Sequence, residues 1–301
     1  MESNYHVPVM LQPCIDGLNI NPDGVYVDVT FGGGGHSKEI LKHLSAKGKL
    51  LAFDQDPDAQ QNIPDDSRLV FIDQNFGFLK NNLRLNGVRQ VDGILADLGV
   101  SSHQFDVPQR GFSIRHNADL DMRMDQYRNL TAAEVLNTYT EDKLHKLFGI
   151  YGEVKNAKSL ARAIVTSRLE NPFTDIDSLK TAIASYIPKG KENKYLAQVF
   201  QALRIEVNAE IQVLEDFLQQ AADVLKPGGR LVVMSYHSLE DRPVKNFMAK
   251  GKFQGEVEKD FFGNQQKPFN VITRKAIVAN EEEIAKNNRA RSAKLRIAEK
   301  I

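Results

Sequence analysis

The stretch "VYVDVTFGGGGHSKEIL", Val25–Leu41, joins a β-branched and aromatic run to an amphipathic run through four consecutive glycines. The first part has the composition of a buried strand, and apolar residues return at helical spacing in the last part. A strand, a glycine-rich turn and a helix in this order expose backbone N–H groups to a ligand at the helix start. The stretch therefore predicts a parallel α/β fold with a ligand-binding turn.

The rest of the first hundred residues repeats this alternation. Strands are expected at 48–56, 67–76 and 91–102, with a helix at 76–87 before the last of them. Alternating strands and helices are typical of a parallel sheet that helices cover on both faces. The predicted fold class is therefore α/β, with a doubly wound, Rossmann-like sheet.

The pattern changes after residue 103, because 104–194 contains no convincing strand. Amphipathic helices are predicted at 131–137, 156–170 and 175–187. A long helical pattern then runs from Leu196 to Leu225 and ends at the turn "KPGG"; strands follow at 230–238, 269–279 and 293–301. The simplest organisation is an α/β domain, residues 1–103 and 195–301, interrupted by an all-helical domain, residues 104–194.

The overall charge does not indicate a partner. Lys+Arg and Asp+Glu both number 39, so the simplest argument for a nucleic-acid partner, a globally basic chain, does not apply. A local patch is still possible in "NNRARSAKLR", which contains Arg289, Arg291, Lys294 and Arg296. This run is either a solvated face or a phosphate-binding segment.

Cysteine content and hydropathy indicate a reducing, cytoplasmic setting. Cys14 is the only cysteine, so an internal disulfide or a cysteine-rich zinc site is excluded. The beginning of the chain lacks the pattern of a signal peptide. No run approaches the ~20 apolar residues of a membrane span. We therefore expect a soluble protein that has no membrane partner.

The glycine loop does not match the loops that bind dinucleotides or triphosphates. The pattern G-x-G-x-x-G, started at Gly32, ends on Ser37, and the Gly-Lys-Ser/Thr of a P-loop is replaced by Gly35-His36. Asp28 precedes the glycines in the order D-x-x-x-G-x-G. This order favours S-adenosylmethionine (SAM), whose sulfonium cation suits nearby acids. The alternative is a structural turn that only allows close packing of helix and strand.

Further polar residues are expected at the carboxyl edge of the sheet. Asp54 ends the second strand about 20 residues after the loop, where a carboxylate accepts the ribose hydroxyls of NAD or SAM. Phe76 ends the third strand and either stacks on adenine or belongs to the core. Asp97 ends the fourth strand, as a reacting group, a cofactor contact or a helix cap. His36 and His237 are expected to make hydrogen bonds, and no metal site is predicted.

Several motifs, spread from residue 6 to the last few residues, together resemble one family. They are "HVPVM" at 6–10, "GVYVDVTFGGGGHS", "AFDQDP", "DGILADLGVSS", "RGFSIR", "LDMRMD", "KPGGRLVVMSYHSLEDR" and "RARSAKLR". This set is similar to the bacterial small-subunit rRNA cytosine-N4 methyltransferases, the RsmH or MraW type. Gly33 and Asn288 stand where relatives often carry other residues.

The resemblance implies a class I SAM-dependent methyltransferase that methylates N4 of a cytidine in the decoding region of 16S rRNA. The helical insertion is then expected to bind the substrate. The cofactor residues implied by the motifs are Gly34, Gly35, His36, Asp54, Phe76, Asp97 and Gln104. Asp97 is also the expected catalytic residue, as an acceptor for a proton of the reacting amine. The oligomeric state and the form of the rRNA substrate are left open.

Three other functions fit parts of the same pattern. They are a SAM methyltransferase that acts on DNA or a small molecule, a nicotinamide oxidoreductase and a nucleotide-binding module without catalysis. The incomplete dinucleotide pattern counts against the oxidoreductase, and the polar residues on four strand ends count against a module without chemistry.

Overall fold

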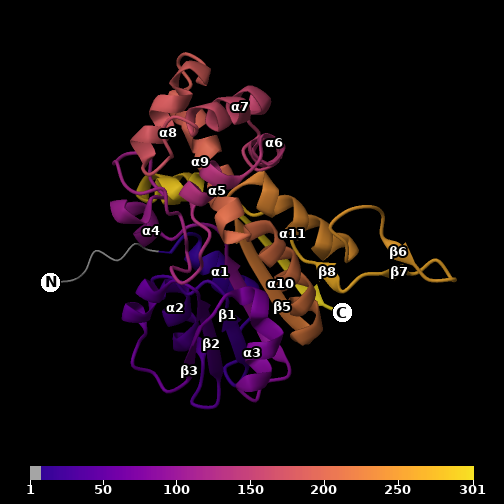
Figure 1. The fold of residues 1–301 in the computed structure, drawn as a ribbon. Coiled ribbons are helices and arrows are strands. Elements are labelled where there is room, and N and C mark those ends of the chain that lie inside the picture. Colours follow the sequence, from indigo (N-terminus) through magenta and orange to yellow (C-terminus); the bar gives the residue numbers. More distant parts are fainter. Residues whose placement is uncertain (1–7) are drawn as a thin grey trace. The chain divides into compact units, whose positions relative to one another are not determined.

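The structure, a computed structural model, describes residues 8–301 and only the backbone at Ser102, so His6 and Val7 of the first motif lie outside it. The described chain divides into two compact units (Figure 1). The sheet unit contains the described residues up to Gly99 together with Ile211–Ile301, and the helical unit is Val100–Glu210.

The sheet unit contains a seven-stranded sheet of order β3-β2-β1-β4-β5-β9-β8. Its strands are β1 (Val25–Asp28), β2 (Lys49–Asp54), β3 (Leu69–Asp73), β4 (Val91–Asp97), β5 (Leu225–Ser235), β8 (Phe269–Val271) and β9 (Lys294–Lys300). The first five strands in this order are parallel, and β9 pairs antiparallel with both β5 and β8. This arrangement confirms the predicted doubly wound sheet.

Helices cover both faces of this sheet. They are α1 (Leu11–Leu18), α2 (Gly35–His43), η1 (Pro57–Asn62), η2 (Phe76–Phe78), α3 (Leu79–Leu85), α10 (Glu210–Val224), α11 (Ser238–Lys250), α12 (Glu281–Lys286) and η5 (Asn288–Ser292). Apolar residues of α1 and α2 form one core with the sheet, and those of α3, α10 and α11 form another. Burial on both faces explains why the central strands are almost continuously apolar.

Several predicted strand boundaries were wrong, and the strand expected at 91–102, for example, ends at Asp97. The strand expected at 269–279 is confined to β8, because the N–H groups of Ile272 and Thr273 both donate to the Ile297 carbonyl, which ends regular pairing. The turn "KPGG" lies inside β5, where Gly228 has φ 80° and the register against β4 shifts. The sheet tolerates the glycine turn as an irregularity in the strand.

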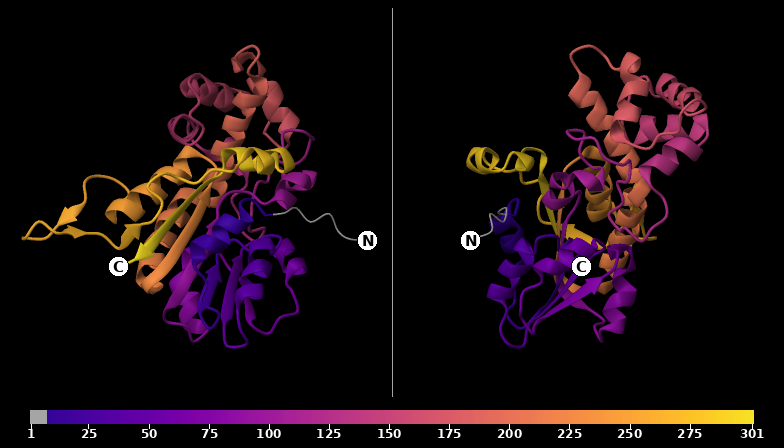
Figure 2. Two further views of the ribbon diagram at one scale, coloured as in Figure 1. Left: turned by 180° about the vertical axis from the view of Figure 1, so that it is seen from behind. Right: turned by 60° about the vertical axis from the view of Figure 1, so that its left-hand side comes forward.

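A two-stranded hairpin extends from the sheet unit between α11 and β8. It consists of β6 (Glu258–Lys259) and β7 (Gln265–Gln266), and it projects away from the seven-stranded sheet in Figure 1 and in the left view of Figure 2. Phe261 and Phe262 are exposed at its tip and pack edge to face. The hairpin was not predicted.

The helical unit has its own hydrophobic core. Its helices are α4 (Ser102–Asp106), η3 (Pro108–Arg110), α5 (Ala132–Thr138), α6 (Glu141–Ile150), α7 (Ala157–Ser167), α8 (Ile176–Ile183), η4 (Ala184–Tyr186) and α9 (Glu192–Asn208). Thr131 and Glu134 form a reciprocal capping box at the start of α5. The helices predicted at 131–137, 156–170 and 175–187 are therefore present.

The predicted boundary at residue 194 was too early. The long helical pattern is two helices, because Ala209 adopts φ 52° and ends α9. Val199 and Leu203 of α9 are buried in the core of the helical unit, so α9 belongs to that unit. The Asn208 side chain is bonded to the backbone of residues 122 and 124. This tertiary contact accompanies the break, and no glycine or proline marks it in the sequence.

Among residues 8–301, no helix is both long enough and apolar enough to span a membrane.

Candidate functional site

The glycine loop connects β1 to α2 in a conformation that glycine favours. Gly32 and Gly34 have φ values of 49° and 74°, and the Gly34 N–H donates to the Phe31 carbonyl at 2.7 Å. A Cβ atom at Gly34 would lie 2.8 Å from the Phe31 ring. Gly34 is also the N-cap of α2 and has no side chain to cap it. The start of this helix can therefore bind an anionic group.

Asp54, at the end of β2, is bonded to this loop. Its Oδ2 accepts the Gly32 N–H at 2.7 Å, and its Oδ1 accepts the Asp56 N–H at 2.9 Å. Burial raises the pKa of the Asp54 carboxyl to about 6. Each carboxylate oxygen can accept a second hydrogen bond. The carboxylate therefore braces the loop and can still accept bonds from two hydroxyl groups of a ligand.

Asp28, at the end of β1, is hydrogen-bonded to residues on both sides of the glycines. Its Oδ2 accepts the Ser37 hydroxyl at 2.7 Å, and its Oδ1 accepts the Thr30 N–H at 3.1 Å. Ser37, in the first turn of α2, thus holds Asp28. Burial raises the pKa of the Asp28 carboxyl, while His36 and these hydrogen bonds oppose the rise. Asp28 therefore holds the loop through its bonds to Ser37 and Thr30.

Asp97, at the end of β4, lies beside the same loop. Its N–H donates to Thr30 Oγ1 at 2.7 Å, and its Oδ1 accepts the Tyr236 hydroxyl at 2.8 Å. His36 Nδ1 lies 3.9 Å from Asp97 Oδ2, too far for a hydrogen bond. Burial raises the pKa of the Asp97 carboxyl to about 6, and His36 and Tyr236 oppose the rise. The site thus contains a carboxylate more basic than an ordinary aspartate.

His36 is buried at the start of α2. Its Nε2 lies 3.2 Å from the Val9 carbonyl oxygen. Because a carbonyl only accepts, Nε2 donates this bond, and Nδ1 faces Asp97. His36 thus makes a hydrogen bond, and its partner is the backbone.

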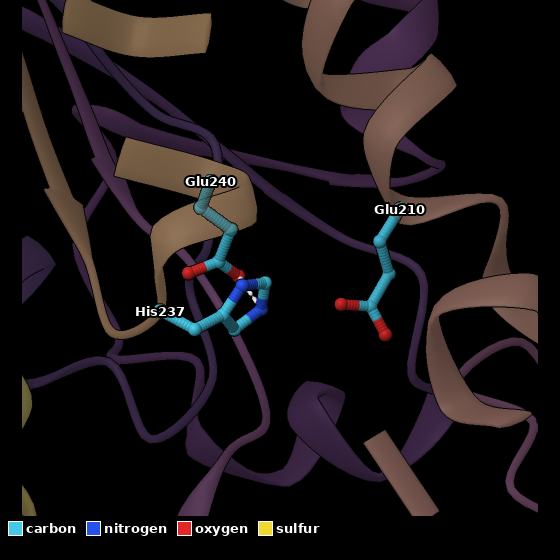
Figure 3. Close-up of side chains that lie close together, drawn as sticks. All are labelled: Glu210, His237 and Glu240. Atoms are coloured by element: carbon cyan, nitrogen blue, oxygen red, sulfur yellow. Dashed lines mark ion pairs between the residues drawn. The ribbon is translucent and has the colours of Figure 1, made fainter. Parts of the chain in front are cut away.

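A second polar turn lies at the end of β5. The Tyr236 N–H donates to Glu240 Oε2 at 2.9 Å, and His237 Nε2 lies 3.1 Å from Glu240 Oε1, as the dashed line in Figure 3 shows. Glu210, also drawn there, is the last residue of the helical unit and pairs with Arg204 of that unit at 2.8 Å. His237 is therefore a polar residue with a bonded partner, as expected.

Tyr236 and Glu240 were not predicted as site residues. Their place in the sequence could have indicated a role in the site. The motif "SYHSLED" comes at the carboxyl end of β5, which lies at the same edge of the sheet as the carboxyl ends of β1, β2 and β4.

The other two predicted cofactor residues lie in different places. Phe76 follows β3 at this edge, half-buried, with its ring packed against Phe217 at a centroid distance of 5.4 Å. It is thus partly a core residue, as the alternative interpretation held. Gln104 is buried in the helical unit, where its side chain accepts the Ser101 N–H at 3.1 Å in a capping box. The sheet unit alone brings together Gly34, Gly35, His36, Asp54 and Asp97, with Phe76 at the same edge.

The first described residues of the chain pack over the glycine loop. Val9 bonds to His36, and the Met10 N–H donates to the Glu283 carboxylate of α12. A Cβ atom at Gly35 would lie 2.1 Å from Pro8 Cγ, a severe overlap. The loop, the Pro8–Met10 segment and α12 are therefore one packed assembly.

The Gly35→Ala variant is expected to lose about 1–3 kcal/mol of unfolding free energy, because the Pro8 ring must move away from the new methyl group. Urea unfolding measures the loss. Gly149→Ala in α6 is the matched control, because its Cβ would make an ordinary 3.8 Å contact. It is expected to be neutral or stabilising. An equal loss in both variants would contradict the packing against Pro8.

The basic run near the end of the chain is only partly available to a ligand. Arg296 is buried and bonds to Asp241 through Nε at 2.7 Å, and Lys294 Nζ lies 3.5 Å from the same carboxylate. Arg291 is exposed and Arg289 is half-buried in η5. The phosphate-binding alternative therefore does not extend to Lys294 and Arg296, because both cations pair with Asp241.

Fold and site together define a class I SAM-dependent methyltransferase: the sheet order, the uncapped helix after a glycine loop, and the acids that end β2 and β4 all belong to this class. The chain belongs to the MraW methylase family, whose sequence model matches residues 3–301. This result confirms the resemblance seen in the motifs, and SAM is the cofactor of the class.

Curated relatives match over nearly the whole chain. Ribosomal RNA small subunit methyltransferase H of Cytophaga hutchinsonii is 58% identical, over 98% of this chain and 99% of the relative. The protein of the same name from Flavobacterium johnsoniae is 59% identical, over 99% of this chain and 98% of the relative. Among solved structures, an rRNA methylase from Streptococcus thermophilus has a TM-score of 0.41 at 13% identity, covering 98% of this chain and 99% of its own.

Proposed function

We propose that this chain transfers the methyl group of SAM to N4 of a specific cytidine in the decoding region of 16S rRNA. The observation that carries the proposal is the Asp97 carboxylate, which lies beside the glycine loop with one oxygen bonded to Tyr236. The names of the curated relatives support the same substrate class.

The residues around the loop fit SAM. Burial raises the pKa values of Asp28, Asp54 and Asp97, and a sulfonium cation nearby would favour their ionised forms. The start of α2, at Gly34 and Gly35, suits the carboxylate of the amino-acid end. When bound, SAM supplies an electrophilic methyl group. In the proposed arrangement Asp54 accepts the ribose hydroxyls, and Phe76 and His36 complete the part of the site that the sheet unit supplies.

The proposed chemistry requires help from a proton acceptor. The lone pair of cytosine N4 is delocalised into the ring, so the amine is a weak nucleophile and must be held in line with the S–CH₃ bond. Asp97 accepts a hydrogen bond from N4–H as the amine becomes tetrahedral and then takes the proton. A carboxyl with a pKa of about 6 is ionised at neutral pH and is a better base than an ordinary aspartate.

The decisive experiment follows methyl transfer from labelled SAM to naked 16S rRNA, intact small subunits and DNA. The expected product is N4-methylcytidine in one or both RNA substrates, and none in DNA. Labelled DNA, or no label in either RNA, would reject the proposal. Titration with SAM and with NADH distinguishes a methyltransferase from a nicotinamide oxidoreductase, because only SAM is expected to bind.

We further propose that the helical unit, Val100–Glu210, and the exposed end of the basic run bind the RNA around the target base. Such a base must be unpaired or flipped to reach the cofactor. A large second unit suits a bulky substrate. Because bacterial ribosomal subunits assemble in the cytoplasm, the reaction belongs there.

The double variant Arg289→Ala with Arg291→Ala is expected to weaken RNA binding and to reduce the slope of log K against log salt by up to about two. Filter binding at several salt concentrations measures this slope. Lys47→Ala with Arg89→Ala is the matched control, because both exposed cations precede parallel strands at the opposite edge of the sheet. If the two double variants share one slope, Arg289 and Arg291 do not contact phosphates.

A further inference from the structure

Tyr236 connects the ends of two neighbouring parallel strands. Asp97 of β4 is the register partner of Met234 of β5, and Tyr236 lies two residues beyond it. Because alternate residues of a strand face the same side, the Tyr236 side chain can reach across to the end of β4. Its hydroxyl donates to Asp97 Oδ1 at 2.8 Å.

Two contacts fix the position of Tyr236, one at its backbone and one at its ring. Its backbone N–H donates to the buried Glu240 carboxylate at 2.9 Å. A Cβ atom at Gly99 would lie 3.4 Å from the Tyr236 ring, so the ring packs against the backbone just after Asp97. Neither contact depends on a flexible surface side chain, and the hydroxyl is therefore presented to Asp97 in a defined direction.

The two oxygens of Asp97 consequently differ. Oδ1 accepts the Tyr236 hydroxyl, whereas Oδ2 lies 3.9 Å from His36 Nδ1, beyond hydrogen-bond distance. Within the described part of the chain, Oδ2 is the oxygen left to accept a bond from an incoming N–H group.

We propose that Tyr236 is a positioning residue, which binds Oδ1 of Asp97 so that Oδ2 is directed at the amine that receives the methyl group. This inference rests on the proposed function, because it assigns the amine contact to Asp97. Tyr236 acts through Asp97 and exchanges no proton with the substrate. Its own hydroxyl is kept neutral, because burial and the Asp97 charge raise its pKa well above the ordinary value.

The hydrogen bond has a predictable effect on titration. Burial raises the Asp97 pKa. The hydrogen bond from Tyr236 stabilises the ionised carboxylate and so lowers this pKa. The other titratable groups near these two residues are His36 of α2, Asp28 of β1, Glu240 of α11 and Cys14 of α1. The Tyr236→Phe variant leaves all four in place. The Asp97 pKa should therefore rise by about one unit when the hydroxyl is removed.

The first test needs no substrate. Carboxyl ¹³C NMR of the ligand-free full chain follows the Asp97 titration in wild type and in Tyr236→Phe, with Asp97→Asn to assign the signal. A rise of about one unit is expected. Tyr26→Phe is the matched control, because its buried hydroxyl accepts the Asn21 N–H at 2.7 Å, away from Asp97, and its loss should leave the titration unchanged. An Asp97 titration unaffected by Tyr236→Phe would overturn the proposal.

The second test separates positioning from cofactor binding. At saturating SAM, Tyr236→Phe is expected to lower the single-turnover rate about tenfold. The acidic limb of its pH profile should move up by about one unit, and the SAM dissociation constant should stay within about twofold. An unchanged rate, or weaker SAM binding with a normal rate, would overturn the proposal. If wild type methylates no RNA, the proposed function fails, while the NMR titration still decides whether Tyr236 controls Asp97.

Discussion

The Asp97→Asn variant is expected to lower the single-turnover rate of methyl transfer by about 10²–10⁴-fold at saturating SAM, the range for loss of a general base. Asparagine keeps Oδ1 as an acceptor for the Tyr236 hydroxyl, so the position of the side chain is preserved. It cannot take a proton from the amine. Rapid-quench measurement with labelled SAM and the RNA substrate determines the rate.

The same substitution is expected to stabilise the ligand-free protein. Burial raises the Asp97 pKa from an ordinary 3.8 to about 6, so the folded state binds the proton more tightly than the unfolded state. The stability cost is absent below about pH 4, grows as the pH rises toward 6, and is complete above it. Removing the charge should add up to about 3 kcal/mol at neutral pH and nothing near pH 4.

These two measurements distinguish the possible roles of Asp97. A catalytic base gives a slow variant that still binds SAM, whereas a cofactor ligand gives weak SAM binding with normal chemistry at saturation. The second outcome would remove Asp97 from the mechanism. Asp92→Asn is the matched control, because Asp92 lies at the other end of β4 and accepts the Val25 N–H and the Lys226 ammonium. It should lose stability without a specific loss of methyl transfer.

The cofactor edge of the sheet was predictable from the sequence for a simple reason. Asp54 and Asp97 each end an apolar run, and the carboxyl ends of parallel strands meet at one edge of the sheet. Local pattern therefore located both carboxylates before the order of the strands was known. The Gly32 N–H can donate to Asp54 because β1, which precedes Gly32, pairs with β2, which Asp54 ends.

The rest depended on contacts between distant residues. Tyr236 and Asp97 are 139 positions apart, and their bond requires β5 to lie next to β4, which no local pattern determines. The break at Ala209 has the same origin, since alanine favours a helix and only tertiary contacts hold it at positive φ. Arg296 looked like part of a basic surface because its partner, Asp241, lies 55 positions away.

The Asp54→Asn variant is expected to weaken SAM binding by about 10²-fold, which corresponds to losing charge-assisted hydrogen bonds to two hydroxyl groups. An amide has a single acceptor oxygen, so it also cannot hold both the Gly32 and the Asp56 N–H groups that Asp54 accepts. Isothermal titration measures the affinity. Asp66→Asn is the matched control, since Asp66 likewise accepts a backbone N–H, from Arg68, but precedes β3 at the opposite edge.

Comparing SAM with S-adenosylhomocysteine tests how Asp54 acts. Both ligands carry the ribose, but only SAM carries the sulfonium charge, so a ribose contact predicts an equal loss for both. A loss confined to SAM would show that Asp54 acts through its charge and would refute the ribose contact.

The pH dependence of binding supplies an independent measure of the same carboxylate. Because the pKa values of Asp54 and Asp97 are raised to about 6, both are partly protonated in the ligand-free protein below neutral pH. A ligand that needs the ionised forms must expel these protons, so SAM affinity should rise between about pH 5 and 7 by up to tenfold per pH unit for each group. Asp54→Asn removes one of the two groups, and its affinity should rise less steeply with pH than that of wild type. Equal slopes would mean that Asp54 keeps its protonation state when SAM binds, and its carboxylate would then have no part in holding the cofactor.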